Sequence, residues 1–465
     1  MAPPAPTSRP PTAEVAATLG RMLGGTVFDL RLLSGGASRV TSAFDLVGGD
    51  GTRRPLILQQ DRGRGVAGPG RVRVEVALLR AAAAVGVPVP GVVALGVDEA
   101  DGLGPGWVVV ERIEGETIPR KILRDAEWAG PRSALTAQCA RALAAIHALA
   151  PDDIVGLADG DLLRDPLTYL DALGETRPAL EFGARWLQLH RPPLGRRVPV
   201  HGDFRLGNLL IGPDGLRAVL DWELAHAGDP AEDLGWLCAP AWRFGGAGAV
   251  GGFGEVSELL AAYVAAGGDD IEPARLTWWV VYATVKWAVI CAMQASSHLS
   301  GTTRSVELAA IGRRVCESEW DLFVLLGLTP DPPSPPLPID DADESSSGPA
   351  PFGRPTAFDL VEAVREYLEA DVMSPNAGTT AGYRSRVARN VLSVVERELR
   401  LGPALARAHR DRLDALGFPD DRALAAAIRA GACDGRWTAV GTALAASARD
   451  QLLVANPSYL PAASA

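Results

Sequence analysis

The hydrophobic periodicity of this chain changes part-way along the sequence. From about residue 28 to 113, short runs such as TSAFDLV and PLILQ alternate apolar with polar residues, and GGDGT between them is typical of a hairpin turn. One stretch with helical spacing, RVRVEVALLRAAAAVG, interrupts these runs. From about 120 to 328 the segments are long and helical, with one short β-rich island at about 199–224. The pattern predicts an α+β fold with an antiparallel small lobe, a mostly helical large lobe, and a ligand site between them.

The chain is too long for one ordinary hydrophobic core, so we expect several parts. A proline-, serine- and acid-rich stretch has almost nothing to bury and indicates a linker, and the pair Thr356 and Asp359 is typical of a helix N-terminus just after it. The predicted parts are a disordered lead-in (1–12), the small lobe (13–113), the large lobe (114–328), the linker (329–355), an all-α helical module (356–455) and a tail (456–465).

Composition excludes several classes of function. The formal net charge is -11, which argues against general binding to nucleic acid or to an anionic membrane. The five cysteines lie far apart and form no C-x-x-C pair, so neither a zinc site nor a disulfide framework is indicated. The most apolar window, residues 276–295, has Lys286 at its centre, which favours a buried helix over a membrane span. With no secretory signal at the N-terminus, we expect a cytoplasmic protein.

The stretch HGDFRLGN, residues 201–208, concentrates polar side chains at the start of the β-rich island. Two short strands follow, NLLIG and LRAVLDW, and a hairpin between them would bring Asn208 close to Asp221. An amide and a carboxylate in such a setting suit Mg²⁺, with Asp203 beside the metal. The alternative is structural, because Asp and Asn in a turn often cap backbone groups.

The same stretch has the spacing of the kinase catalytic loop, H-R-D-x-x-x-x-N. Together with VLDWELAHAGDPAEDLGWL, in which D-W-E stands in place of D-F-G, it resembles the aminoglycoside phosphotransferase-like small-molecule kinases over about residues 25–328. The resemblance implies a protein-kinase-like fold, ATP or GTP as phosphate donor, Asp203 as catalytic base, and Asn208 and Asp221 as ligands of Mg²⁺. It also implies that His201 and Asp233 hold the catalytic loop by hydrogen bonds.

The small lobe carries the expected nucleotide contacts. SGGASRVTSAF, which includes Ser38, lies between two strand patterns as a phosphate-covering turn would. Backbone groups of Glu111 and Ile113, between the lobes, are expected at the adenine edge, with Ile57 packed on the face of the base.

One position departs from the family pattern. The family carries a basic residue on the strand PLILQQD that contacts the phosphates and pairs with a glutamate of the next helix; here the glutamate is Glu75, but the strand residue is Gln59. A glutamine brings no charge, and charge-assisted hydrogen bonds are about twice as strong as neutral ones. Four nearby arginines are candidates for compensation: Arg53, Arg54, Arg62 and Arg64.

Three further polar residues leave two interpretations open. Asp233 begins an apolar helical run, where a capping role would explain it equally well. Arg205 is a candidate for binding a phosphate or an acceptor anion, or for bracing its own loop. His147 ends an apolar helix, and that spacing favours a packed histidine over a functional one.

Two functions therefore compete. The first is an active kinase that phosphorylates a hydroxyl of a small molecule, and the second is a nucleotide-binding pseudokinase scaffold, as Gln59 suggests. The motifs look most like kinase domains associated with acyl-CoA dehydrogenases, which implies a hydroxyacyl-CoA acceptor and an acyl-CoA dehydrogenase-type partner; an aminoglycoside is the alternative acceptor. The segments AFDLVEAVREYLE and YRSRVARNVLSVVERELRLGP resemble a small helical domain of unassigned function.

Overall fold

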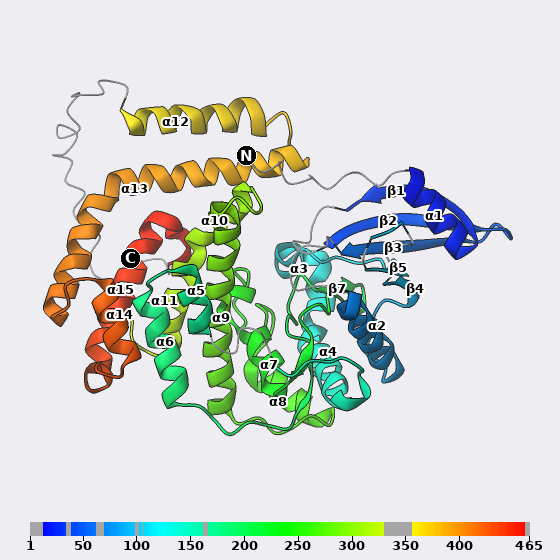
Figure 1. The fold of residues 1–465 in the computed structure, drawn as a ribbon, viewed down its shortest axis with the longest axis horizontal. Helices are drawn as coiled ribbons and strands as arrows, with labels where there is room; N and C mark the ends of the chain where they lie inside the picture. The colour runs from blue at the N-terminus through cyan, green and yellow to red at the C-terminus, as the bar shows by residue number, and fades with distance from the viewer. Residues whose placement is uncertain are drawn as a thin grey trace. The chain divides into compact units, whose positions relative to one another are not determined.

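A computed structural model describes residues 13–33, 39–61, 69–97, 102–104, 106–160, 166–329 and 356–460 (Figure 1). The chain forms two compact units. Unit 1 consists of Met1–Arg164 with Pro192–Ala283, and unit 2 of Asp165–Arg191 with Thr284–Ala465. The predicted lead-in and nearly all of the predicted linker lie outside the described residues.

The small lobe of unit 1 is an antiparallel sheet of five strands in the order β1-β2-β3-β5-β4, as the alternating pattern predicts. Its elements are α1 (Ala13–Leu23), β1 (Gly25–Leu32), β2 (Arg39–Gly48), β3 (Arg53–Asp61), α2 (Pro69–Ala84), β4 (Val92–Gly96) and β5 (Trp107–Glu111). The predicted turn between β2 and β3 closes through a hydrogen bond from Gly51 N–H to Gly48 C=O, and Gly51 has the positive φ of 81° that favours glycine.

The two faces of this sheet have different functions because successive side chains of a strand point to opposite sides. One face packs with Leu19 of α1 into a hydrophobic core, contributed mainly by Phe44, Leu46, Leu56, Leu58, Trp107 and Val109. On β3, Ile57 and Gln59 therefore belong to the other face, opposite Ala43 and Thr41 of β2. Arg39 shares that face, two positions before Thr41.

The rest of unit 1 is mostly helical, with two small sheets that pair β6 with β9 and β7 with β8. The elements in chain order are α3 (Pro119–Arg124), α4 (Ala129–His147), β6 (Val198–Val200), β7 (Leu209–Gly212), β8 (Gly215–Val219), β9 (His226–Gly228), α7 (Pro230–Cys238), α8 (Val256–Ala265) and the first residues of α9 (Pro273–Leu299). Glu116 and Ile211 exchange backbone hydrogen bonds of 2.8 and 2.9 Å, which tie the segment after β5 to β7.

Unit 2 is helical throughout its described residues. Besides the later part of α9 it contains α5 (Pro166–Leu173), α6 (Pro178–Leu189), α10 (Val306–Ile311), α11 (Val315–Leu325), α12 (Ala357–Tyr367), α13 (Thr380–Leu416), α14 (Asp421–Arg429) and α15 (Trp437–Ala455). One hydrophobic core joins Phe182 of α6 and Phe323 of α11 with Val440 and Leu452 of α15. Unit 2 therefore combines part of the predicted large lobe with the predicted helical module. Apolar spacing indicates that a helix face is buried, but it does not indicate which other helices cover that face.

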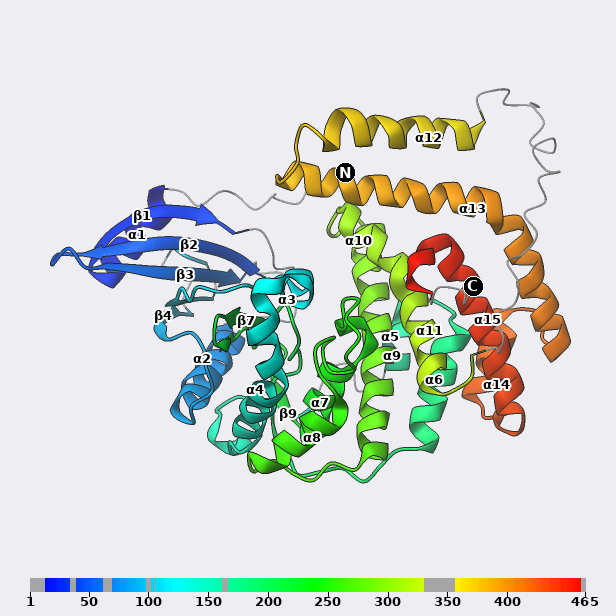
Figure 2. The same ribbon diagram turned by 180° about the vertical axis from the view of Figure 1, so that it is seen from behind.

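The predicted capping pair of the helical module is present. Thr356 and Asp359 form a capping box at α12, with Thr356 N–H donating to Asp359 Oδ2 at 2.7 Å. The long helix α13 contains Pro403, which removes one helical hydrogen bond, and Figure 2 shows the helix bending along its length. The apolar side of α12 is only partly covered, since Leu360 is 55% and Val364 50% exposed.

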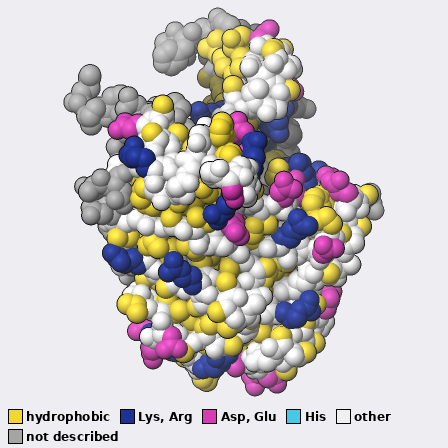
Figure 3. Space-filling view, turned by 90° about the vertical axis from the view of Figure 1, so that its right-hand side faces the viewer, with side chains coloured by type: hydrophobic (Ala, Val, Ile, Leu, Met, Phe, Trp, Pro, Cys, Tyr) yellow, Lys and Arg dark blue, Asp and Glu magenta, His cyan; other side chains and the backbone are white. Residues whose placement is uncertain are grey.

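The apolar helix α9 passes the length and composition test for a membrane span, alone among the helices of the described residues. However, 78% of its apolar window is buried by the rest of the protein, and Lys286 is 3% exposed, as expected for a core helix. On the face drawn in Figure 3, acidic and basic side chains are interspersed and neither sign dominates.

Candidate active site

The β7–β8 hairpin positions the two predicted metal ligands. Leu209 pairs with Val219, and Leu220 N–H donates to Asn208 C=O at 2.8 Å. Asn208 therefore lies at one end of the hairpin, beside the residue that precedes Asp221 on the other strand, as the sequence predicts. Asp221 has a positive φ of 63°, an unfavourable conformation for a residue with a side chain, of the kind that often occurs at functional sites.

Asp203, the predicted base, is held by three donors. Its Oδ1 accepts hydrogen bonds from Arg205 Nε and from the indole Nε1 of Trp236, both at 2.8 Å. Its Oδ2 accepts one from Asn208 Nδ2 at 2.6 Å. Because the amide nitrogen of Asn208 is used in this way, its Oδ1 is the atom left to face a metal ion. Trp236 lies among the apolar residues of α7, so the sequence pattern alone predicts no role for it in the site.

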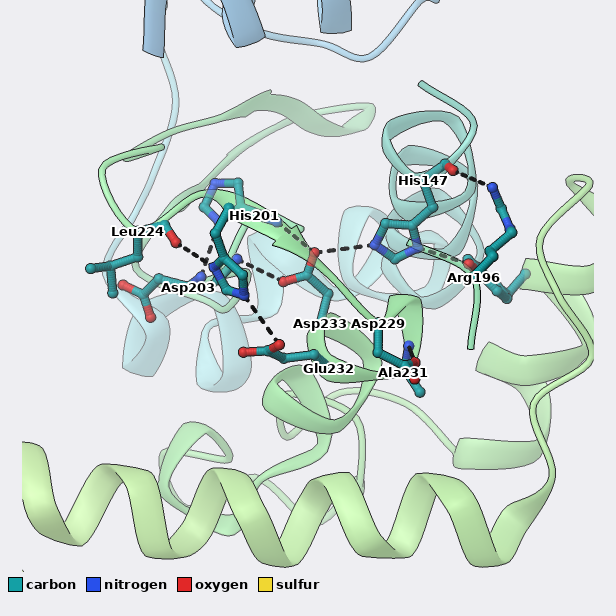
Figure 4. Close-up of polar contacts among 12 residues, drawn as sticks. His147, Arg196, His201, Asp203, Leu224, Asp229, Ala231, Glu232 and Asp233 are labelled. Carbon is teal, nitrogen blue, oxygen red and sulfur yellow. Dashed lines mark hydrogen bonds and ion pairs between the residues drawn. The ribbon is translucent and has the colours of Figure 1, made fainter. Parts of the chain in front are cut away.

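Asp233 lies between His201, at the start of the 201–208 loop, and His147, as Figure 4 shows. Asp233 is fully buried and accepts backbone N–H groups from His201 at 2.7 Å and from Gly202 at 2.9 Å. His201 donates from Nε2 to Leu220 C=O at 3.0 Å, and its Nδ1 accepts the N–H of Asp203 at 3.2 Å. Burial lowers the pKa of His201, which keeps the ring neutral and able to accept that bond. These contacts support the predicted roles of both residues in holding the loop.

The alternative interpretation of Asp233 as a helix cap is wrong. Asp229 caps α7 instead, accepting from Ala231 N–H at 2.9 Å, and it also pairs with Arg275. Burial would raise the pKa of Asp233, but the hydrogen bond from His147 and the nearby imidazoles hold the pKa below its usual value.

His147 is a packed residue, as its spacing favours. It is fully buried, with Nε2 3.2 Å from Asp233 and Nδ1 2.7 Å from the hydroxyl of Tyr263. Its backbone C=O accepts a hydrogen bond from Arg196 at 2.8 Å (Figure 4). His147 therefore supports Asp233 and is separated from the catalytic loop by it.

The partner of Glu75 is Arg39, a residue that no sequence motif marks. Arg39 Nη2 lies 2.5 Å from Glu75 Oε2, and the two side chains are 7% and 4% exposed. Arg39 can reach Glu75 from β2 because it shares the sheet face of Gln59. Among the predicted compensating arginines, Arg53 pairs with the exposed Asp29 of β1 and the buried Asp45 of β2, and Arg62 and Arg64 lie outside the described residues. No contact explains a role for Arg54.

Acidic groups gather around Asp221. Burial, followed by the charges of Glu223, Asp203 and Glu75, raises the pKa of Asp221 to about 7, while Arg39 lowers it. For Arg39 itself, burial opposes the charged form, but Glu75, Glu223 and Asp221 together raise its pKa. A cation beside Asp221 would relieve this crowding of negative charge.

The donor set fits magnesium bound with a nucleotide. Mg²⁺ is commonly held by one or two carboxylates and completes its shell with phosphate oxygens and water. Asp221 and the free oxygen of Asn208 match that need. Within the described ranges no group of three or more His, Cys, Asp or Glu side chains has the spacing of a metal site, so a cation held by protein side chains alone is not indicated there.

Backbone hydrogen bonds of the small lobe limit which groups are available for the predicted contacts with adenine. Glu111 N–H donates to Gly91 C=O at 2.9 Å, so the carbonyl of Glu111, not its N–H, is the group available to a base. Ile113 follows in the segment that Glu116 ties to β7, and Ile57 is half-buried on the same sheet face as Gln59. Ser38 lies outside the described residues.

Two protein-family models match this chain. The first describes the phosphotransferase enzyme family and matches residues 29–279, which is just over half of the chain. The chain belongs to this family. Residues 375–459 match a second model, a domain of unknown function named DUF6285. The resemblance to small-molecule kinases and the predicted two-lobed fold are thereby confirmed.

Two curated relatives each match about a third of the chain. Mouse acyl-CoA dehydrogenase family member 10 is 33% identical over 174 residues, or 35% of this chain and 16% of the relative. Human acyl-CoA dehydrogenase family member 11 is 30% identical over 175 residues, or 34% of this chain and 22% of the relative. The chain thus spans about a fifth of the length of these relatives.

A solved structure shares the fold. It comes from Ralstonia eutropha, is provisionally assigned as an aminoglycoside phosphotransferase, and is 22% identical, with a TM-score of 0.54. The match covers 69% of this chain and 99% of that one.

Proposed function

We propose that this phosphotransferase moves the terminal phosphate of ATP to a hydroxyl group of a small metabolite. The observation that carries the proposal is the buried Arg39–Glu75 ion pair, which lies within electrostatic reach of Asp221. It supplies the positive charge that Gln59 lacks. A scaffold that only bound nucleotide would have use for this charge, but it would not need a base held by three donors, as Asp203 is.

Each residue of the group then has a part in transfer. Asn208 and Asp221 would hold Mg²⁺, which when bound offsets negative charge on the phosphates. Asp203 accepts the proton of the acceptor hydroxyl as the oxygen attacks. Its Oδ2 is the better acceptor, because it takes one hydrogen bond whereas Oδ1 takes two. Arg205 and Trp236 keep the carboxylate in that orientation.

For the nucleotide, Arg39 contacts the α- and β-phosphates in place of a basic residue at position 59. Its planar guanidinium suits bidentate contact with phosphate, and Glu75 orients it. The carbonyl of Glu111 and the N–H of Ile113 meet the adenine edge, with Ile57 against the base.

For the acceptor, we propose a hydroxyacyl-CoA, with an acyl-CoA dehydrogenase-type enzyme as metabolic partner. The similarity to acyl-CoA dehydrogenase family members supports this, although it covers about a third of the chain. Next to Asp203, the Arg205 guanidinium stacks 4.4 Å from the ring centroid of Trp242. This stacking and the bond to Asp203 hold Arg205 in place beside the position proposed for the acceptor hydroxyl.

The test uses purified full-length protein with magnesium and ATP, offered hydroxyacyl-CoA thioesters and aminoglycosides side by side. We expect phosphate transfer to the thioesters, and its loss in Asp203→Asn. If the wild type transfers phosphate to nothing and hydrolyses ATP no faster than this variant, the kinase proposal fails. A melting shift with ATP but no turnover would favour the scaffold, as Gln59 alone would suggest.

A further inference from the structure

A cavity of about 670 Å³ lies within unit 2, apart from the residues of the candidate active site. Its walls come from α9, α10 and α11 and from α13, α14 and α15 of the DUF6285 region. Figures 1 and 2 both show α13 and α15 beside one another on this unit. The volume is in the range of cavities that take a whole small molecule.

Small side chains open this cavity. Ala295 of α9, Ala309 of α10, and Gly402 and Ala406 of α13 all line it. Gly402 directly precedes Pro403, where α13 bends, so the cavity lies at an irregular part of that helix. Leu405 and Val454 add apolar surface, and the lining is mainly apolar.

A polar group lines one wall. His409 of α13 has its Nδ1 3.0 Å from Ser447 Oγ, and its Nε2 lies 3.1 Å from both oxygens of Asp421. Arg412 donates to the same Ser447 oxygen at 3.2 Å and pairs with Asp450. All five residues line the cavity, so this wall is polar, although the lining as a whole is mainly apolar.

The charges of the lining are already compensated. Besides the pair with Asp450, Arg313 lies 2.7 Å from Glu398, and Arg177 lies 2.7 Å from Glu175. A charged ligand would have to leave water without gaining a free counter-charge, which is unfavourable. The cavity therefore favours a neutral molecule.

Asp421, His409 and Ser447 are connected in the same sequence of contacts as the acid, base and nucleophile of a hydrolytic triad. However, the helical backbone around Ser447 argues against a hydrolytic reaction. Ser447 lies within a regular part of α15, and its hydroxyl also contacts the Ala443 carbonyl at 3.2 Å. The N–H groups around a residue inside a helix are engaged in helical hydrogen bonds, so none is available as an oxyanion donor. Binding is the function that these residues can perform.

We propose that this cavity is a second ligand site, for a neutral, mainly apolar small molecule with one carbonyl group that accepts a hydrogen bond from Arg412, whose guanidinium carries N–H groups beyond those donated to Ser447 and Asp450. The apolar body lies against the alanines of α9, α10 and α13. The site is independent of the proposed phosphoryl transfer, since it shares no residue with it.

The probe for the test is Nile red, a neutral, fluorescent, mainly apolar molecule with a ring carbonyl, titrated into the full-length protein. We expect saturable binding to one site. Ala406→Phe and Ala309→Phe, which fill the cavity from two different helices, should each weaken binding at least tenfold, with folding checked by circular dichroism. Arg412→Met, which removes the donor, should weaken it about fivefold, the effect of one lost hydrogen bond. Ser447→Ala, which removes a hydroxyl already engaged by His409, Arg412 and Ala443, should weaken it less than about twofold.

Two controls separate the alternatives. Leu360→Asp on the exposed side of α12 should leave binding unchanged, as should Asp203→Asn in the active site. The proposal is overturned if neither phenylalanine variant weakens binding while both remain folded, or if Leu360→Asp abolishes it. Equal or tighter binding of the anionic dye 1-anilinonaphthalene-8-sulfonate at the same site would overturn the neutral ligand class.

Discussion

Two histidine–aspartate pairs in this protein have similar geometry but different surroundings. His147 and Asp233 of unit 1 are 3.2 Å apart and both fully buried, whereas His409 and Asp421 of unit 2 are 3.1 Å apart with side chains 29% and 43% exposed. The first pair anchors backbone groups that form the catalytic loop. The second faces a cavity. Burial, more than the pair itself, determines whether such an interaction fixes a loop or remains available to a ligand.

The largest expected effect is at Asp233. Asp233→Ala leaves the N–H groups of His201 and Gly202 and the ring of His147 without their buried acceptor, and should cost about 3–5 kcal/mol in unfolding free energy and most activity. Urea denaturation and kcat would measure both. Stability equal to the wild type would show that the loop is held by other contacts.

The same carboxylate predicts a pH dependence. Its pKa is lowered from 3.8, so its stabilisation is complete above that value and is lost as pH falls through the lower pKa of the folded state. Asp233→Asn cannot titrate. Its deficit in unfolding free energy should be largest at neutral pH and shrink in acid, and a deficit that grows on acidification would contradict this sign.

The next largest effect is expected at Arg39, and it tests whether the buried Arg39–Glu75 ion pair helps to bind the nucleotide. Arg39→Gln should raise the KM for ATP roughly tenfold or more, because charge-assisted bonds to phosphate are lost. Arg39→Lys should retain part of the affinity. Adding Gln59→Lys to Arg39→Gln should restore it, since both side chains share one sheet face. An unchanged KM in Arg39→Gln would mean that another group binds the phosphates.

Trp236 should have a smaller effect, confined to turnover. Trp236→Phe removes one of the two donors to Asp203 Oδ1 and should lower kcat roughly fivefold with little change in KM. Trp278→Phe removes a tryptophan of α9 that is not a donor to Asp203 and serves as the matched control. Equal losses in both variants would indicate a packing effect only.

The smallest effect is expected at the exposed pair. Asp421→Asn should change the unfolding free energy by less than about 1 kcal/mol, because solvent screens a half-exposed ion pair. A loss as large as that of Asp233→Ala would remove the contrast between the two pairs.

Much of the catalytic group is local in sequence and was predictable. Asp203, Asn208 and His201 lie within one loop, and the hairpin that brings Asp221 to them needs only two short strands and a turn. Trp236 and Arg39 were missed for a shared reason. Each acts on a residue far along the chain, and neither residue type nor spacing marks an indole or a guanidinium that reaches across the fold.

The sequence by itself determined the order of strands and helices, the capping box at Thr356, and the catalytic spacing, because periodicity and short-range hydrogen bonding fix these locally. Only the tertiary structure decided that Arg39 pairs with Glu75, that Asp233 supports a loop while Asp229 caps the helix, and that α15 shares a core with α6 and α11. These pairings depend on which buried faces of the helices and strands come into contact. Many faces have the same apolar pattern, so the sequence pattern alone does not specify which of them pack together.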